Sequence, residues 1–161
     1  MQIETVVVNS SPLIVLFRSG QADLIPKLFK EVIVPEQVYA EVLAGKENDA
    51  ARASLPRIEW VIRKKVEISL SVAAWNLGSG ESAVFSYALE TPGARALVDD
   101  LAARRCAKAF GIPTLGTGAL LILAKRCGLI DSVKDGIQSL RDTGLYLSDS
   151  VVRLLISEAG E

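Results

Sequence analysis

Short apolar runs rich in β-branched residues alternate along the chain with longer segments in which apolar residues recur every three or four positions. The short runs are typical of buried strands, and the longer amphipathic segments are typical of helices. Strands are expected at 6–8, 31–35, 58–62, 66–70, 95–100 and 112–117. Helices are expected at 12–20, 21–29, 36–45, 78–90, 101–111, 118–128, 132–144 and 148–160. This alternation predicts a three-layer α/β/α fold whose central sheet is mainly parallel.

The composition predicts one compact domain spanning residues 1–161. Of the 161 residues, 50% are hydrophobic and 23% are charged, which is enough for one sizeable core. The formal net charge of −1 argues against a protein that coats nucleic acid by bulk positive charge. No apolar run reaches the roughly 18 residues of a membrane span, and Glu4 rather than a basic flank precedes the first valines. We therefore expect a cytoplasmic protein that does not enter a membrane.

The chain has no histidine, which narrows the chemistry. Catalysis by Ser-His-Asp or Cys-His groups and histidine-ligated zinc are excluded. The two cysteines, Cys106 and Cys127, are too few for a thiolate zinc site, and we expect them to be buried small hydrophobic residues. Any reaction must therefore use carboxylates, hydroxyls, lysines or a bound metal.

Polar residues lie at the carboxyl ends of two of the expected strands. Asn9 comes after the first valine run, and Asp99 and Asp100 are the last two residues of the strand expected at 95–100. Because the carboxyl ends of parallel strands share one edge of a sheet, these side chains are expected to converge. Glu41 and Glu81 lie on helices that can point toward the same edge. Clustered carboxylates repel one another unless a cation offsets them, and oxygen ligands suit Mg²⁺ or Mn²⁺.

Each of these acidic residues also has an ordinary structural interpretation. A glutamate on a helix is most often a solvated surface charge. Glu81 lies where an anion favours a helix N-terminus, and Asp99 or Asp100 can cap the helix that follows. Arg104 is placed to contact a substrate phosphate, but it is also placed for an i,i+4 ion pair with Asp100.

Five segments together resemble the PIN-domain superfamily, in particular a PIN-like family of predicted nucleic-acid-binding proteins. The resemblance covers nearly the whole chain. The segments are VVVNSSPLI, VPEQVYAEVL, GSGESAVFSYALE, ALVDDLAARRCAKAFGI and GTGALLILAKRCGLI. The resemblance implies a three-layer fold and, in active relatives, cleavage of RNA that depends on Mg²⁺ or Mn²⁺, often by the toxin of a toxin–antitoxin pair.

The resemblance also implies roles for individual residues. The positions that match the family's acidic metal ligands and catalytic groups are Asn9, Glu41, Glu81 and Asp99 or Asp100. Ser11 matches the small hydroxyl residue that braces the turn of the first acid. Asn9 stands where the family usually has aspartate, and an amide offers an oxygen to a cation but no negative charge.

Two functions follow from this substitution. The first is an endoribonuclease whose activity Asn9 weakens, with a small antitoxin protein as a partner and with its oligomeric state, homodimer or not, left open. The second is a catalytically silent domain that binds RNA or a protein. Arg104, Arg105 and Lys108 are expected to border the acidic pocket and to bind RNA phosphates, since a negative pocket cannot attract RNA unaided.

A dinucleotide-binding domain is a third alternative. The segment GSGESA fits a loose G-x-G-x-x-A fingerprint through Gly78, Gly80 and Ala83, and Asp99 follows at a suitable distance. That fingerprint requires a strand directly before the glycine turn, whereas SVAAWNL separates the turn from the expected strand at 66–70.

Overall fold

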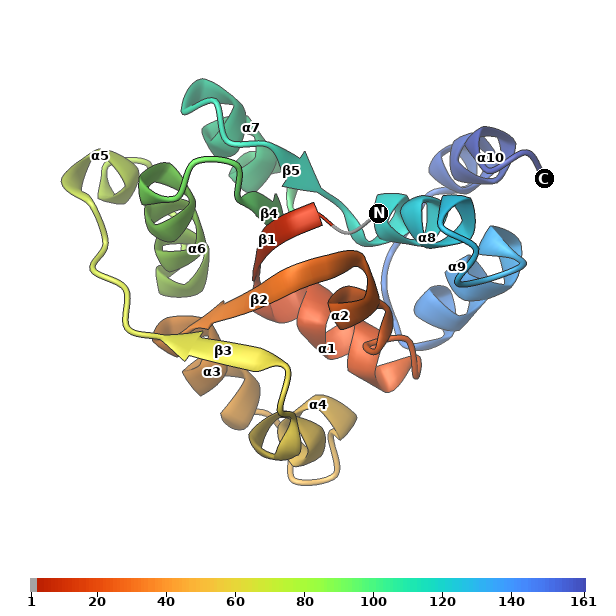
Figure 1. Cartoon of the computed structure of the whole chain (residues 1–161), viewed down its shortest axis with the longest axis horizontal. Helices are drawn as coiled ribbons and strands as arrows, with labels where there is room; N and C mark the ends of the chain where they lie inside the picture. The colour runs from red at the N-terminus through yellow and green to blue at the C-terminus, as the bar shows by residue number, and fades with distance from the viewer. Residues whose placement is uncertain (1–2) are drawn as a thin grey trace.

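The computed structural model describes residues 3–161 and contains a five-stranded sheet in which all strands are parallel. The strand order is β3-β2-β1-β4-β5, so the chain starts in the middle of the sheet and builds outward on both sides (Figure 1). The strands are β1 (Ile3–Val8), β2 (Phe29–Pro35), β3 (Val61–Lys64), β4 (Arg95–Leu97) and β5 (Thr114–Leu115).

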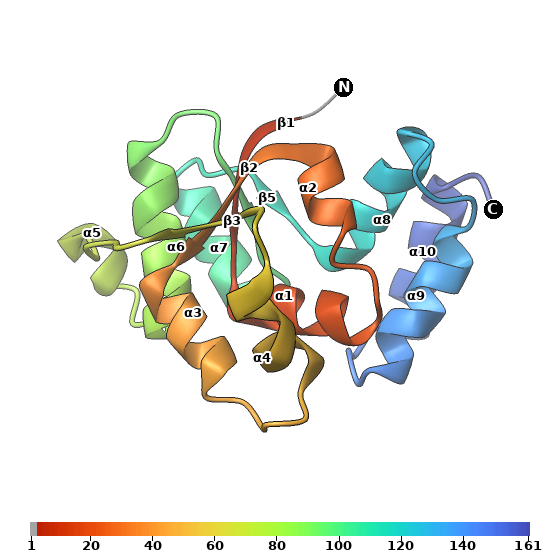
Figure 2. The same ribbon diagram turned by 60° about the horizontal axis from the view of Figure 1, so that its bottom comes forward.

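Helices cover both faces of the sheet, as Figure 2 shows with α6 and α7 on one side and α1 and α2 on the other. A further group, α8 to α10, packs beside α2 at one end of the molecule. The first helices are α1 (Ser10–Arg18), α2 (Leu24–Leu28), α3 (Glu36–Leu43), α4 (Ala50–Ser54) and the 3-10 turn η1 (Leu55–Arg57). The others are α5 (Leu70–Ala73), α6 (Ser79–Glu90), α7 (Leu101–Ala109), α8 (Thr117–Arg126), α9 (Val133–Asp142) and α10 (Asp149–Glu158). The expected three-layer α/β/α fold is confirmed.

The central strand β1 is buried on both faces, which explains its continuous valine run. Val6, Val7 and Val8 have no exposed surface. Val7 pairs with Ile33 of β2 on one side and with Ala96 of β4 on the other. A strand enclosed in this way needs apolar residues at successive positions rather than alternating ones.

Several expected strands differ from the structure, and those at 95–100 and 112–117 are shorter, as β4 (Arg95–Leu97) and β5 (Thr114–Leu115). Residues 66–69 form no strand, and the segment continues into the short helix α5. The side chain of Ser69 accepts a hydrogen bond from the backbone N–H of Val72, so it caps a helix where alternation suggested a strand. The strand expected at 58–62 is present as β3 but begins at Val61. Within residues 3–161, no helix combines the length and apolar character needed to cross a membrane.

Candidate active site

Asn9 lies at the carboxyl edge of the sheet, between β1 and α1. Its backbone N–H donates to the carbonyl oxygen of Leu97 at 3.1 Å, which continues the pairing with β4 one residue beyond β1. Only 4% of Asn9 is exposed. Its Oδ1 atom is one of two buried side-chain polar atoms without a hydrogen-bond partner in the described part of the chain. A buried acceptor left unpaired costs about 1–3 kcal/mol.

Glu41, on α3, is held by residues from two other helices. The hydroxyl of Ser10 on α1 donates to Glu41 Oε2 at 2.6 Å, and the backbone N–H of Gly80 on α6 donates to Oε1 at 3.1 Å. A Cβ atom at position 80 would lie 2.5 Å from Oε1. Although Glu41 is exposed, its carboxylate is therefore fixed in direction.

Glu81, at the start of α6, is partly buried near two other acidic residues. Burial raises the pKa of its carboxyl above the ordinary value of 4.5, and the charges of Asp100 and Glu41 raise it further. Hydrogen bonds from the backbone of Gly78 and from the side chain of Asn9 act in the opposite direction. Glu81, Asp100, Glu41 and Asn9 therefore lie close enough to affect one another.

Asp99 and Asp100 differ in their surroundings. Asp99 accepts two hydrogen bonds from Thr117 at the start of α8, from the backbone N–H at 2.7 Å and from the hydroxyl at 2.5 Å. Thr117 itself is fully buried. Asp100 Oδ2 accepts from the backbone N–H of Ala103 at 2.9 Å and so caps α7. Asp100 therefore has the helix-capping role that the sequence predicted for one of these two residues. Its charge also raises the pKa of Glu81.

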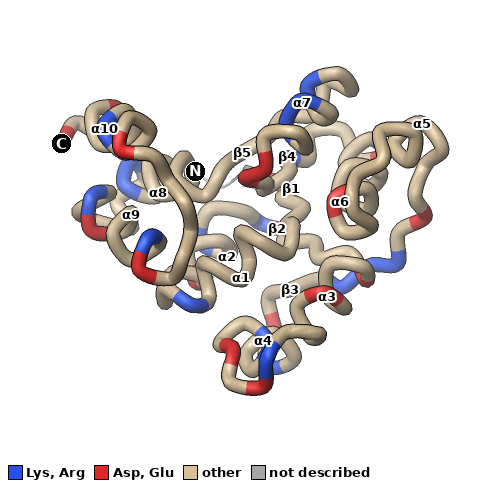
Figure 3. Tube along the Cα trace, turned by 180° about the vertical axis from the view of Figure 1, so that it is seen from behind, with Lys and Arg blue, Asp and Glu red and all other residues tan. Residues whose placement is uncertain are grey.

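The three basic residues of α7 do not share one environment. The guanidinium of Arg104 is folded inward, where Nε donates to the carbonyl oxygen of Val98 at 3.1 Å and the group packs against Gly116. Arg105 and Lys108 are exposed. The ion pairs found among residues 3–161 include none between Asp100 and Arg104. Figure 3 shows acidic segments on α3, on α6 and at the end of β4, and basic segments along α7.

A groove of about 570 Å³ is lined by Asp99 and Asp100 and by residues of α7, α8, α10 and the loop before α10. Its volume falls within the range of roughly 300–1,000 Å³ that is usual for ligand sites. Of the expected RNA-binding residues, only Arg104 lines this groove. The rest of its wall comes from Leu101, Gly116, Gly118, Ala119, Leu145, Tyr146, Leu147, Ser148, Val151 and Leu155.

The carboxylate and amide oxygen atoms at this edge of the sheet are the type of ligand that a hard divalent cation prefers. Their arrangement, however, does not surround a single ion position. No group of three or more His, Cys, Asp or Glu side chains within residues 3–161 is arranged to share one ion. The unpaired, buried Oδ1 of Asn9 and the mutual repulsion at Glu81 nevertheless fit a cation bound by oxygen atoms. The side chains whose oxygen atoms could serve as ligands for such a cation are those of Asn9, Glu81, Glu41 and Asp100.

Three residues of this arrangement escaped sequence reasoning: Ser10, Gly80 and Thr117. Ser11, expected to brace the first turn, is exposed, and the hydroxyl that contacts an acid belongs to Ser10. The position of Ser10, as the first helical residue after Asn9, is the sequence feature that indicates this role. Thr117 lies between the two glycines of the GTG segment, a pattern that is typical of a tight turn and carries no signal for a contact with Asp99.

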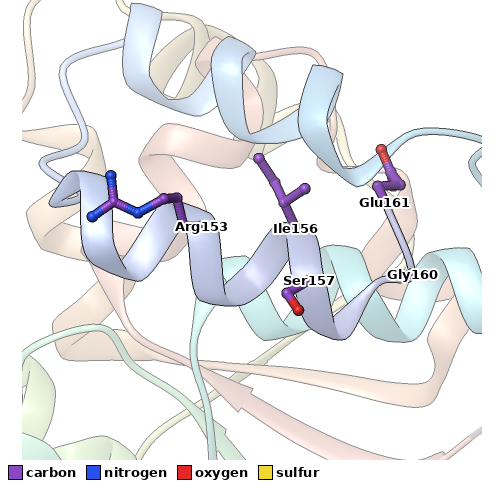
Figure 4. A pocket seen from close by; sticks show the side chains of 5 residues that line it. All are labelled: Arg153, Ile156, Ser157, Gly160 and Glu161. Atoms are coloured by element: carbon purple, nitrogen blue, oxygen red, sulfur yellow. The ribbon is translucent and has the colours of Figure 1, made fainter.

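A smaller pocket of about 390 Å³ lies at the end of α10 (Figure 4), and it shares no lining residue with the groove at Asp99 and Asp100. Arg153, Ile156, Ser157, Gly160 and Glu161 line it. The carboxylate of Glu161 accepts hydrogen bonds from Lys125, from Ser132 and from the backbone N–H groups of Val133 and Lys134. It thereby joins α8 to the start of α9, which is a structural role.

The glycines of GSGESA do not form a dinucleotide turn. The helix α5, rather than a strand, precedes them, and Gly80 lies inside α6. The role of Gly80 is close contact with Glu41. The structure therefore lacks the strand–turn–helix arrangement that the dinucleotide fingerprint requires.

Comparison with known proteins agrees with this architecture. The family model described as a PIN domain matches residues 5–161. No curated protein matches the chain. The match covers nearly all of the sequence, including every residue of the acidic site, and the parallel five-stranded sheet is the fold expected for it. The chain belongs to the PIN-domain family.

Proposed function

We propose that this protein is an endoribonuclease that depends on Mg²⁺ or Mn²⁺ and that Asn9 makes it a slow one. The observation that carries the proposal is the environment of Glu81, where burial and the charges of Asp100 and Glu41 together disfavour the carboxylate. Like charges gathered in this way are typical of a site that a cation completes. The nuclease-like fold of the family supports the same reading.

In this proposal Glu81 and Asp100 supply the charge that holds the cation, and Asn9 Oδ1 supplies a neutral oxygen. Ser10 and Gly80 orient Glu41, and Thr117 orients Asp99. A bound Mg²⁺ or Mn²⁺ would supply Lewis-acid activation of a water for attack on an RNA phosphodiester. Arg104, with Arg105 and Lys108 on the same helix, attracts the phosphates toward these acids.

A catalytically silent domain that binds RNA or a protein is the second candidate, and Asn9 is the observation that favours it. The amide removes one negative charge from the centre of the site. We also propose that the protein acts in the cytoplasm as the toxin of a toxin–antitoxin pair, with a small antitoxin as its partner. A neighbouring gene for such a small protein would support this part of the proposal.

The test is cleavage of a mixed RNA pool by the purified native chain with Mg²⁺, with Mn²⁺ and with EDTA. We expect slow cleavage that needs the metal and that Glu81→Gln and Asp100→Asn abolish. Because a trace of contaminating nuclease would survive both substitutions, unchanged cleavage by these variants contradicts the proposal. RNA or protein binding without cleavage under any condition favours the silent domain.

A further inference from the structure

Strand β3 forms one outer edge of the sheet, and its free side is open to a further strand. The strand order ends at β3, which pairs with β2 alone (Figure 1). Apart from this pairing, the backbone groups of Val61–Lys64 make no hydrogen bond to another backbone group within residues 3–161. An edge strand carries a row of unpaired N–H and C=O groups on its outer side, and an extended peptide can pair with such a row.

This edge is longer than the opposite one and is held in place. The strand at the opposite edge, β5, has two residues, whereas β3 has four and is followed by residues 65–69, which form neither helix nor strand. The side chain of Gln37 donates to the carbonyl oxygen of Val66 at 2.9 Å, so α3 fixes this continuation of the edge. Little order is therefore lost when a further strand pairs with β3.

The exposed side chains of this edge are positively charged, in a chain whose formal net charge is −1. Arg63, Lys64 and Lys65 are consecutive and exposed. Arg63 is already engaged, because its Nε donates to Glu36 Oε1 at 2.7 Å and its guanidinium lies 4.0 Å from the centre of the Tyr39 ring. Lys64 and Lys65 take part in no ion pair within residues 3–161. The two lysines are free to face acidic side chains.

The combination of an open backbone edge and two lysines selects among the occupants of the edge. A second copy of β3 would set lysines against lysines, and like charges placed opposite each other destabilise a strand pair. RNA phosphates match the lysines but not the row of backbone N–H and C=O groups. An extended peptide with aspartate or glutamate side chains matches both.

We propose that β3 is a docking edge for an acidic, extended peptide segment of a partner protein, which joins the sheet as an additional strand. Main-chain hydrogen bonds to β3 supply the affinity, and Lys64 and Lys65 select acidic side chains on the added strand. This surface is separate from the acidic site, and the inference does not depend on the proposed ribonuclease function.

The test uses a fluorescein-labelled peptide of about eight residues, in which glutamate alternates with valine and threonine, and measures its binding by anisotropy. We expect saturable binding to the native chain. Lys65→Glu is expected to weaken binding about 2- to 30-fold, because a favourable cross-strand charge pair becomes a repulsive one. The matched control is Lys134→Glu, which changes the net charge equally at an exposed position of α9, away from β3 (Figure 1), and should bind like the native chain.

A second probe separates main-chain pairing from attraction between charges alone. The same peptide with alternate amide nitrogens methylated keeps its charges but loses hydrogen-bond donors, and it is expected not to bind. On the native chain, the unmodified peptide should slow hydrogen exchange at the amides of residues 61–65. Binding of the methylated peptide as tight as that of the unmodified one, or unchanged exchange at residues 61–65, overturns the proposal. If Lys65→Glu fails to fold, these measurements on the native chain decide.

Two other occupants of the edge would also overturn the proposal. If the native chain sediments as a dimer and the amides of residues 61–65 are protected without peptide, a second copy occupies β3. If single-stranded RNA slows exchange at these amides and the peptide does not, Lys64 and Lys65 bind phosphates. None of these outcomes involves the acidic residues, so the ribonuclease proposal stands or fails by its own test.

Discussion

Gly80 and Glu41 meet so closely that a Cβ atom on residue 80 would lie 2.5 Å from Glu41 Oε1. Helices α3 and α6 are therefore in contact at the acidic site itself. The obstructed atom is the end of a side chain that can rotate, so an added methyl group displaces the carboxylate rather than the backbone.

Gly80→Ala is therefore expected to separate folding from metal binding. Alanine favours the helix by about 1 kcal/mol, so the melting temperature should change by only a few degrees. Displacing Glu41 should weaken Mn²⁺ binding about 10- to 100-fold, as the loss of an orienting contact does. Calorimetric titration with Mn²⁺ measures this. The control is Gly78→Ala, whose methyl group would meet no atom within 4 Å; equal affinities for the two variants would contradict the prediction.

Asn9→Asp should restore the charge that the site lacks. We expect faster RNA cleavage with Mg²⁺ or Mn²⁺, because the new carboxylate helps to hold the ion. Without metal the same variant should melt at a lower temperature than the native chain, since a buried carboxylate would stand beside Glu81. The double variant Asn9→Asp with Asp100→Asn should lose the gain. Cleavage by Asn9→Asp that is as fast in EDTA as in Mg²⁺ would refute this prediction.

Glu81→Gln should stabilise the metal-free protein at neutral pH. The pKa of Glu81 is raised on folding, so the folded protein disfavours the carboxylate, and this penalty is fully present above the raised pKa. Removing the charge is expected to raise the melting temperature by about 1–4 °C at pH 7. The gain should vanish as the pH falls below 4.5, where the carboxyl is protonated in both states. Melting curves of the variant and the native chain from pH 7 to pH 4 measure this gain. A difference in melting temperature that stays constant over this range would contradict the prediction.

The stability that the Glu161 carboxylate contributes should depend on pH in the opposite direction. Lys125, together with the backbone N–H groups of Val133 and Lys134, lowers the pKa of its carboxyl from 4.5 to about 2. The stabilisation is therefore present above 4.5 and is lost as the pH falls toward 2. Glu161→Gln should melt at a lower temperature than the native chain at pH 7, and the two curves should approach each other between pH 5 and pH 3. Parallel curves over that range would be inconsistent with the assignment.

Thr117→Val should loosen Asp99. The hydroxyl of Thr117 donates to Asp99 Oδ2 at 2.5 Å, and hydrogen bonds to charged groups contribute about 1.5–3 kcal/mol. Valine keeps the shape, so we expect the melting temperature to fall by about 3–10 °C. Thr117→Ser retains the hydroxyl and should recover most of the loss. If serine and valine destabilise the protein equally, packing rather than the hydrogen bond explains the effect.

The sequence was informative where one physical requirement dominated. A strand enclosed on both faces must be apolar throughout, so the valines of β1 and the EVIVP segment of β2 predicted the centre of the sheet. The parallel arrangement then placed Asn9 and Asp100 at one edge. The segment at 66–70 was harder, because a few alternating residues are compatible with several structures and the cap at Ser69 decided between them.

The details of the site depended on rotations that a sequence does not encode. Ser10 and Ser11 are adjacent and chemically identical, but successive residues of a helix differ in direction by about 100°, so only Ser10 reaches Glu41. Likewise, Asp99 and Asp100 have the same side chain and different partners. Tyr146 stands alone in a loop without periodicity, so no pattern could connect it with the acids.

The hydrogen bond from the backbone of Asn9 to Leu97 has a consequence for how such a site changes over generations. The bond uses a backbone N–H group, which every residue except proline possesses. The position of the main chain at residue 9 therefore does not depend on the side chain that residue 9 carries. Asparagine and aspartate are nearly equal in size, and their codons differ by a single nucleotide. One point mutation at position 9 can therefore exchange asparagine and aspartate, and so change the charge of the site, while the backbone keeps its hydrogen bond to Leu97. The reverse mutation restores the original charge.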